Sequence, residues 1–198
     1  MKNLFLTAIF LTLPILSITS CSAFYNKDYG EINYTGDGKF IDKGRDASRD
    51  RFLLDLGQVE LNQKSKSSYT IKGLPETSFT IALQVDLPVS NNFPLESPTL
   101  YPSLQFTNET VLFLELEDMD GKKLFSYNGP LSKLDRNVLQ TTEGGYKPIY
   151  YLERQAAAAG TNFTPKNKMT YRLNLSVTKA NQSAPRINVI AIGHSGWK

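Results

Sequence analysis

Residues 169–177 read MTYRLNLSV, a stretch in which apolar and polar side chains alternate without a break. Because successive side chains of a β-strand point to opposite faces, this alternation predicts a strand with one face in a core and the other in solvent. Residues 79–85, FTIALQV, alternate in the same way, and residues 110–116, TVLFLEL, form a mostly apolar run of similar length. These three stretches indicate a protein built mainly from β-sheet.

Shorter segments on either side of these stretches have the same character, and turn residues end each of them. They are residues 52–56, 68–72, 123–127, 149–152 and 186–192. About seven strands of this kind, with no strong amphipathic helix, predict an all-β fold with a single β-sandwich, Ig-like or similar. We expect the sandwich to span residues 51–198.

The sequence Asp118-Met119-Asp120-Gly121 separates two of the expected strands and predicts the turn of a β-hairpin. Its two aspartates also suggest a calcium-binding loop. However, an EF-hand loop that began at Asp118 would need a bidentate glutamate at position 129, and this residue is glycine. The hairpin turn is therefore the favoured interpretation, and no metal site is expected here.

Two longer stretches are expected to be loops that carry recognition. Residues 88–102 contain four prolines, which remove backbone donors and exclude an inner strand. Residues 143–167 include an alanine-rich part, 152–159, that fits either a short helical turn or a loop. Because binding residues concentrate in loops held by a rigid scaffold, recognition is expected in these two segments.

The composition is that of an ordinary globular chain: 198 residues, 40% hydrophobic and 21% charged, with a net charge of +3. Acidic and basic residues are interspersed, and no stripe of lysine and arginine is interleaved with aromatics, so nucleic acid is not an expected partner. Cys21 is the only cysteine, which excludes a disulfide within the chain.

The N-terminus has the layout of a secretory signal peptide. Lys2 supplies the positive start, residues 4–16 read LFLTAIFLTLPIL, and the small polar residues 17–20 follow. The apolar run is shorter than the roughly 20 residues that a transmembrane helix needs. Export followed by removal of residues 1–20 is therefore expected.

The residues at the end of this segment, Ile18-Thr19-Ser20-Cys21, resemble the lipobox of bacterial lipoproteins. The resemblance implies cleavage before Cys21, lipidation of its thiol and a cell-envelope location. Two or three acyl chains hold a protein on a bilayer where a single chain would exchange. In a Gram-negative host, Ser22 in place of aspartate favours the outer over the inner membrane. A plain signal peptide with a chance cysteine, or an uncleaved anchor, is the alternative.

Residues 21–50 are rich in glycine, aspartate, lysine and asparagine and have no sustained period. This composition predicts a flexible tether between the lipid and the folded domain. The aromatic residues Phe24, Tyr25, Tyr29 and Tyr34 are exceptions in this stretch. They could pack on the domain or lie at the membrane interface.

Side chains for catalysis are few. His194 is the only histidine, and Gly193-His194-Ser195-Gly196 lacks the order of a nucleophile elbow. Glu115 and Glu117 would share one face of a strand, where an exposed outer face accounts for them without catalysis. Neither an enzyme nor a cofactor is therefore expected.

Aromatic side chains are the best candidates for ligand binding. Tyr146, Tyr150, Tyr151 and Trp197 could line a groove that stacks on sugar rings or on a peptide, although strands also use such residues for packing. The leading hypothesis is a membrane-anchored lipoprotein, non-enzymatic, whose β-sandwich binds another protein of the cell envelope. The alternative is a carbohydrate-binding or peptidoglycan-binding module.

Overall fold

The computed structural model describes residues 32–43, 50–86, 106–140, 146–151, 164–166 and 168–194. Strands account for most of them. In chain order the elements are β1 (Lys39–Asp42), β2 (Asp50–Val59), β3 (Ser65–Lys72), β4 (Phe79–Val85), α1 (Phe106–Glu109), β5 (Val111–Asp118), β6 (Lys123–Pro130), η3 (Leu131–Lys133), β7 (Asp135–Gln140), β8 (Tyr146–Tyr151), β9 (Thr170–Lys179) and β10 (Ile187–His194).

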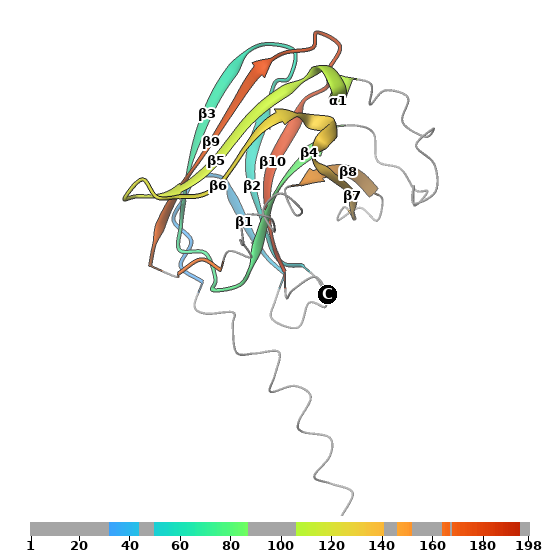
Figure 1. Cartoon of the computed structure of the whole chain (residues 1–198). Helices are drawn as coiled ribbons and strands as arrows, with labels where there is room; N and C mark the ends of the chain where they lie inside the picture. Colours follow the sequence, from blue (N-terminus) through green and yellow to red (C-terminus); the bar gives the residue numbers. More distant parts are fainter. Residues whose placement is uncertain are drawn as a thin grey trace, which may run out of the picture.

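The strands form two antiparallel sheets that pack face to face, so the expected β-sandwich is confirmed (Figure 1). The larger sheet has the order β1-β2-β10-β4-β8-β7, and the smaller has the order β3-β9-β5-β6. The described residues form ten strands rather than about seven, because β1 and β7 lie in segments without clear alternation. β2 also runs on through Gly57, which has a positive φ of 102°, where a break was expected.

The connectivity is that of a jelly roll. Most successive strands change sheet, and eight of them give the facing orders β2-β10-β4-β8 and β3-β9-β5-β6. β1 and β7 extend the larger sheet at its two edges. An immunoglobulin domain instead places its first and second strands in one sheet. The sandwich is therefore similar to, but not the same as, the Ig-like arrangement.

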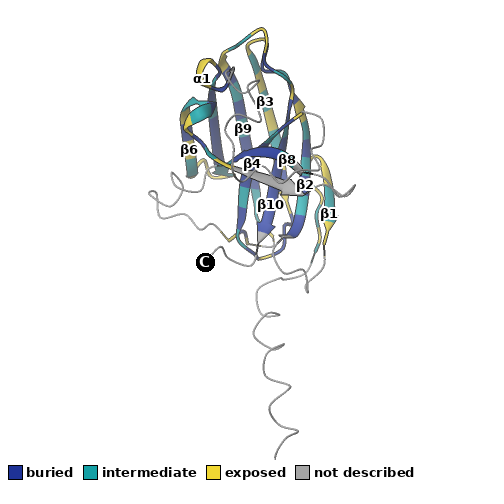
Figure 2. Cartoon of the chain, turned by 90° about the vertical axis from the view of Figure 1, so that its right-hand side faces the viewer, coloured by how far each residue is buried: buried dark blue, intermediate teal, exposed yellow. Residues whose placement is uncertain are grey.

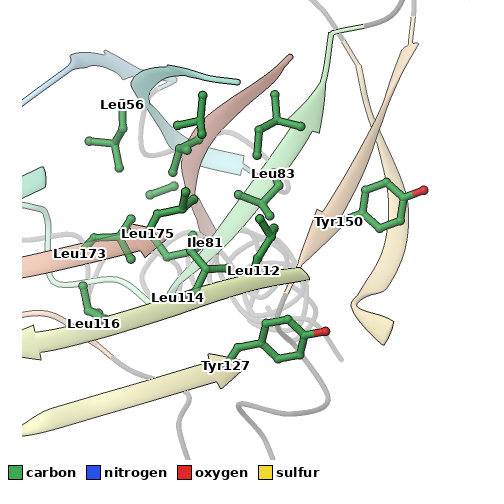
Figure 3. Close-up of a cluster of buried hydrophobic side chains, with 14 of the residues drawn as sticks. Leu56, Ile81, Leu83, Leu112, Leu114, Leu116, Tyr127, Tyr150, Leu173 and Leu175 are labelled. Atoms are coloured by element: carbon green, nitrogen blue, oxygen red, sulfur yellow. The ribbon is translucent and has the colours of Figure 1, made fainter. Parts of the chain in front are cut away.

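The core lies between the sheets, and leucine is its most frequent residue (Figure 3). On the smaller sheet, Leu114 of β5 and Leu175 of β9 are completely buried. They face the larger sheet, where Ile81 and Leu83 of β4 are 3% and 1% exposed. The burial of β9 alternates along the strand, as its sequence predicted. Figure 2 shows the same buried band along β10 and its neighbours.

The larger sheet is also apolar on its outer face, which the sequence reasoning missed. A second buried cluster contains Ala82, Ile149, Ile190 and Ile192, with Leu53 and Tyr151 packed against it. Their chain neighbours point the other way, into the main core. A strand that is buried on both faces shows a continuous apolar run instead of alternation. Residues 189–192, VIAI, are such a run.

The N-terminal part of the domain closes one side of the sandwich, and we call residues 33–42 the N-terminal strap. Along β3, the Thr35 N–H donates to the Lys72 carbonyl at 3.0 Å and the Asp37 N–H donates to the Thr70 carbonyl at 2.7 Å. The chain turns at Gly38, φ 84°, and returns along β2 as β1. The strap therefore connects the edges of the two sheets.

These residues belong to the stretch expected to be a tether, so residues 33–42 of that stretch are part of the folded domain. Tyr34 packs against the core and stacks on Phe40, with ring centroids 5.4 Å apart, and Phe40 stacks on Phe52 at 5.2 Å. Of the two expected places for Tyr34, the domain is the correct one. Phe24, Tyr25 and Tyr29 lie outside the described residues.

The hairpin turn between β5 and β6 is confirmed. The Asp118 carboxylate accepts hydrogen bonds from the backbone N–H groups of Asp120 at 3.0 Å and Lys122 at 2.9 Å. Gly121 has the positive φ, 76°, that this turn needs. One oxygen of the carboxylate is thus used to close the turn, which supports the turn interpretation over a calcium loop.

Replacing this carboxylate tests its role. Asp118→Ala should lower the free energy of unfolding by about 1 kcal/mol, because two exposed backbone donors lose their acceptor. Asp118→Asn keeps an acceptor oxygen and should lose less than half as much. Urea unfolding measures both values. A melting temperature of the unmodified chain that rises on calcium addition would contradict the turn interpretation.

Candidate functional site

Two of the four aromatic residues proposed as a binding groove, Tyr150 and Tyr151, lie on opposite faces of the larger sheet. Tyr150 is 3% exposed and its ring lies in the main core (Figure 3). Tyr151, the next residue of β8, packs against the second cluster on the opposite face of the sheet. Adjacent strand residues cannot line one groove, because their side chains leave the sheet on opposite sides. The side chain of Tyr146 and the whole of Trp197 lie outside the described part of the chain.

The environment of Tyr150 suits a structural role. Burial raises the pKa of its hydroxyl, and the nearby Arg136 and Thr107 only partly oppose this. The hydroxyl therefore stays protonated at neutral pH. Its ring contributes to the contact between the sheets, as tyrosines in cores generally do.

The carboxylates Glu115 and Glu117 of β5 share one face of the strand, as expected, but Glu115 is buried, at 8% exposure, where an exposed face was expected. Glu115 forms an ion pair with Lys123 at 2.6 Å and raises the pKa of that lysine. Glu117 accepts a hydrogen bond from the Asn174 amide at 3.3 Å and lies 3.6 Å from Arg172. Because each carboxylate already has a cross-strand partner, the pair stabilises the sheet and does not form an acid–base dyad.

Other expected features fall partly or wholly outside the described residues. Cys21 and the loop at 88–102 lie there entirely. Of residues 143–167, only 146–151 and 164–166 are described, and the first of these is strand β8. His194 ends β10, but its side chain is not among those described.

A groove of about 910 Å³ lies at the end of the sandwich where the N-terminal strap begins. Three segments meet there: the strap, the connection from β3 to β4, and the residues just before β9 (Figure 1). We call this the basic groove. Its lining residues are Asn33, Thr35, Lys72, Gly73, Glu76, Thr164, Pro165, Lys166 and Lys168.

Backbone contacts hold the walls of the basic groove. Gly73 has a positive φ of 77°, and a Cβ at this position would overlap the Asn33 carbonyl oxygen. The Lys166 N–H donates to the Tyr171 hydroxyl at 3.0 Å, and the Lys166 carbonyl accepts from the Met169 N–H at 2.9 Å. The strap and the β3–β4 connection therefore meet through their main chains, and the segment before β9 is held by β9 and by its own turn.

The charge of the basic groove favours anions. Lys72, Lys166 and Lys168 are exposed, and Glu76 is the single carboxylate of the lining, which leaves three positive charges against one negative. Within the described ranges, no carboxylate forms a salt bridge with any of the three lysines. Asn33, Thr35 and Thr164 add groups that hydrogen-bond to oxygen. This lining suits an anionic, oxygen-rich ligand.

A second candidate surface is the edge of β3, which is the outermost strand of the smaller sheet. The strap hydrogen-bonds to its lower part, at Thr70 and Lys72, and then crosses to β2. Since backbone groups of an edge strand face outward at every second residue, Lys66 and Ser68 present theirs on the same edge. No strand of the described residues pairs with β3 there. We call this part the open β3 edge.

The described residues contain no group of three or more histidine, cysteine, aspartate or glutamate side chains placed to hold a metal ion. They also include no helix long and apolar enough to cross a membrane.

Comparison with protein-family models, with curated proteins and with solved structures found no match for this chain. Function must therefore be inferred from the residues themselves.

Proposed function

We propose that this chain is a lipid-anchored lipoprotein of the bacterial cell envelope, non-enzymatic, whose β-sandwich binds another protein there. The lipobox at residues 18–21 supports the anchor on Cys21, and Ser22 favours the outer membrane in a Gram-negative host. The observation that carries the binding role is the open β3 edge. The strap already hydrogen-bonds to the backbone of β3 at Thr70 and Lys72. The outward backbone groups of Lys66 and Ser68 continue this row, and no described strand pairs with them.

The open β3 edge suits an extended segment of a partner protein. A segment added to a sheet edge gains main-chain hydrogen bonds at alternate residues, and its side chains supply the specificity. The outward groups of Lys66 and Ser68 have this spacing. Lys64 and Lys66 repel the same edge of a second copy, as lysines on edge strands generally do, and favour an acidic partner segment.

The direction of β3 keeps this edge accessible on an anchored protein. The strap begins beside Lys72, at the C-terminal end of β3. The open part lies toward Ser65, at the other end of the strand. A chain that is tethered through residues 22–32 to a membrane therefore presents the open β3 edge away from its point of attachment.

Backbone variants test this proposal in the native cells. Ser68→Pro removes an outward N–H, and proline is tolerated where the N–H of an edge strand faces solvent. We expect crosslinking and co-purification of the partner to fall at least tenfold, with the melting temperature nearly unchanged. Ser68→Ala, which keeps the N–H, should retain the partner.

One outcome would decide against the open β3 edge. Equal recovery of the partner by Ser68→Pro and by the unmodified chain would remove it as the binding surface. Ser67→Pro serves as the folding control, because this N–H faces β9 and its loss should destabilise the sheet. A Cys21→Ala strain that keeps its membrane location would refute the anchor separately.

The carbohydrate-binding alternative is less well supported, because two of the four aromatic residues on which it rested cannot line one groove. Tyr150 is buried between the sheets and Tyr151 packs on the opposite face. No stacking platform for sugar rings remains among the described residues of that set. Binding of a protein segment is therefore the preferred function.

A further inference from the structure

The basic groove brings together three lysines from two distant parts of the chain. β3 pairs with β9 in antiparallel register, with Lys72 opposite Thr170. The residues that follow β3 and those that precede β9 therefore meet at one end of the smaller sheet. Lys166 and Lys168 lie just before β9, so all three lysines line one concave surface.

The position of this groove relative to the proposed anchor decides which anion it meets. Asn33 lines the groove and is 12 residues after Cys21 (33 − 21 = 12). A fully extended chain spans at most about 3.5 Å per residue, so the groove stays within about 40 Å of the lipidated residue. Tethering over such a distance gives effective concentrations in the millimolar range. The headgroups of the anchoring membrane are thus the most concentrated anions near this surface.

The chemistry of the lining agrees with a phospholipid headgroup. Ammonium groups bind phosphate oxygens as point charges, and each lysine near an anionic bilayer contributes about fivefold to binding. The groove, at about 910 Å³, is larger than a phosphate ion needs. Asn33, Thr35 and Thr164 also line the groove, and their side chains can hydrogen-bond to the hydroxyl groups of a glycerol headgroup.

We propose that the basic groove binds the phosphate of anionic phospholipid headgroups in the membrane that holds the Cys21 lipid, so that the sandwich docks on the bilayer by this end. The inference rests on the proposed lipid anchor. It adds an orientation to that function, because docking through the groove turns the open β3 edge away from the bilayer. The lipid and the groove then act as two contacts with the same surface.

The test is a lysine footprint of the full chain as purified from its cells and inserted into vesicles. One set of vesicles is phosphatidylcholine, and the other is one part phosphatidylglycerol to two parts phosphatidylcholine, which makes the surface anionic. An amine-reactive label and mass spectrometry report the accessibility of each lysine. Lys64, Lys133 and Lys179 are exposed lysines outside the groove and serve as matched controls.

We expect phosphatidylglycerol to protect the three groove lysines about fivefold or more and to leave the three controls unchanged. Lys72→Gln should then raise labelling of Lys166 and Lys168 in anionic vesicles by at least about threefold, because docking is cooperative among the lysines. Lys64→Gln should have no such effect. Equal labelling of the groove in the two sets of vesicles would overturn the inference.

Three further measurements distinguish headgroup binding from binding of free phosphate, from unspecific adsorption and from a missing lipid anchor. Protection by inorganic phosphate in neutral vesicles, to the same extent as by phosphatidylglycerol, would assign the groove to a free phosphate compound and overturn membrane docking. Equal protection of the control lysines would show unspecific adsorption and overturn it as well. The mass of the N-terminal peptide reports lipidation of Cys21 independently, so a failed anchor is distinguished from a failed groove.

Discussion

Gly38→Ala is expected to lower the free energy of unfolding by about 4 kcal/mol. Gly38 has φ 84°, a conformation that costs an alanine about 1 kcal/mol. In addition, a Cβ at this position would overlap the carbonyl oxygen of Asp55 and meet the Cα of Leu56 at 3.0 Å. Both are backbone atoms of β2 and cannot rotate away. The strap must therefore separate from the sandwich to accommodate the methyl group.

Separation of the strap loses several interactions at once. The hydrogen bonds of Thr35 and Asp37 to β3 are broken, and so is the pairing of β1 with β2. The stack of Phe40 on Phe52 opens as well, which exposes a core side chain. Together these losses account for the larger part of the expected change.

Gly121→Ala is the matched control. Gly121 has nearly the same φ, 76°, but no atom lies within 4 Å of the position that a Cβ would take. Strain alone should cost about 1 kcal/mol there. Urea unfolding of the two variants, with hydrogen exchange at the amides of Thr35 and Asp37, measures the difference. Equal losses in the two variants would show that the strap contributes little to stability.

This result bears on the proposed function because, with a lipid anchor on Cys21, the strap would be where the tether joins the domain. A force from such an anchor would reach the described part of the domain near Asn33. Asn33 also lines the basic groove, and the turn at Gly38 marks where the strap leaves β3. We therefore expect a weakened strap to disturb the basic groove and to uncover the part of the β3 edge that the strap now occupies.

The fold could be predicted from the sequence where strands have one buried face. Residues 169–177 alternate, and β9 covers all of them except Met169, with one face buried. Residues 79–85 form β4, in which Ala82 is buried as well, on the opposite face. β7 could not be found in this way, because DRNVLQ has only two apolar residues and the strand lies at the edge of the larger sheet. β1 has four residues and is held mainly by its pairing with β2. Backbone pairing of this kind does not require alternating apolar and polar residues, so the local sequence does not indicate it.

The candidate site was harder to predict than the fold. Tyrosines were chosen for their chemistry, but strand geometry places Tyr150 and Tyr151 on opposite faces, and this could have been inferred from their being adjacent. To predict the basic groove, one would also have needed to know which strands pair. Had the strands at 68–72 and 169–177 been paired in antiparallel register, Lys72 and Lys168 would have met at one end. No local pattern indicates which strands pair, since that depends on the topology of the whole sandwich.

The inward side chains of β10 become smaller along the strand, from Ile187 through Val189 and Ala191 to Gly193. The reason lies on the neighbouring strand. Gly193 is opposite Phe52, and a Cβ on this glycine would overlap the phenyl ring. Phe52 is completely buried beneath the strap, so its ring has no free space to enter.

Gly193→Ala should therefore lower the free energy of unfolding by about 3 kcal/mol, at the upper end of the usual cost of overpacking a core. Phe52→Leu alone should cost about 1–2 kcal/mol through lost contact with Phe40. If the overlap is the cause, the double variant should be more stable than the sum of the single changes predicts, by about 1–2 kcal/mol. Val177→Ala, near the other end of the core, should combine additively with Gly193→Ala. If the free-energy changes of Gly193→Ala and Phe52→Leu also add in the double variant, the overlap with the phenyl ring is not the cause of the destabilisation. Coupling would instead show that this glycine makes room for the aromatic stack that holds the strap, and with it the tethered end of the domain.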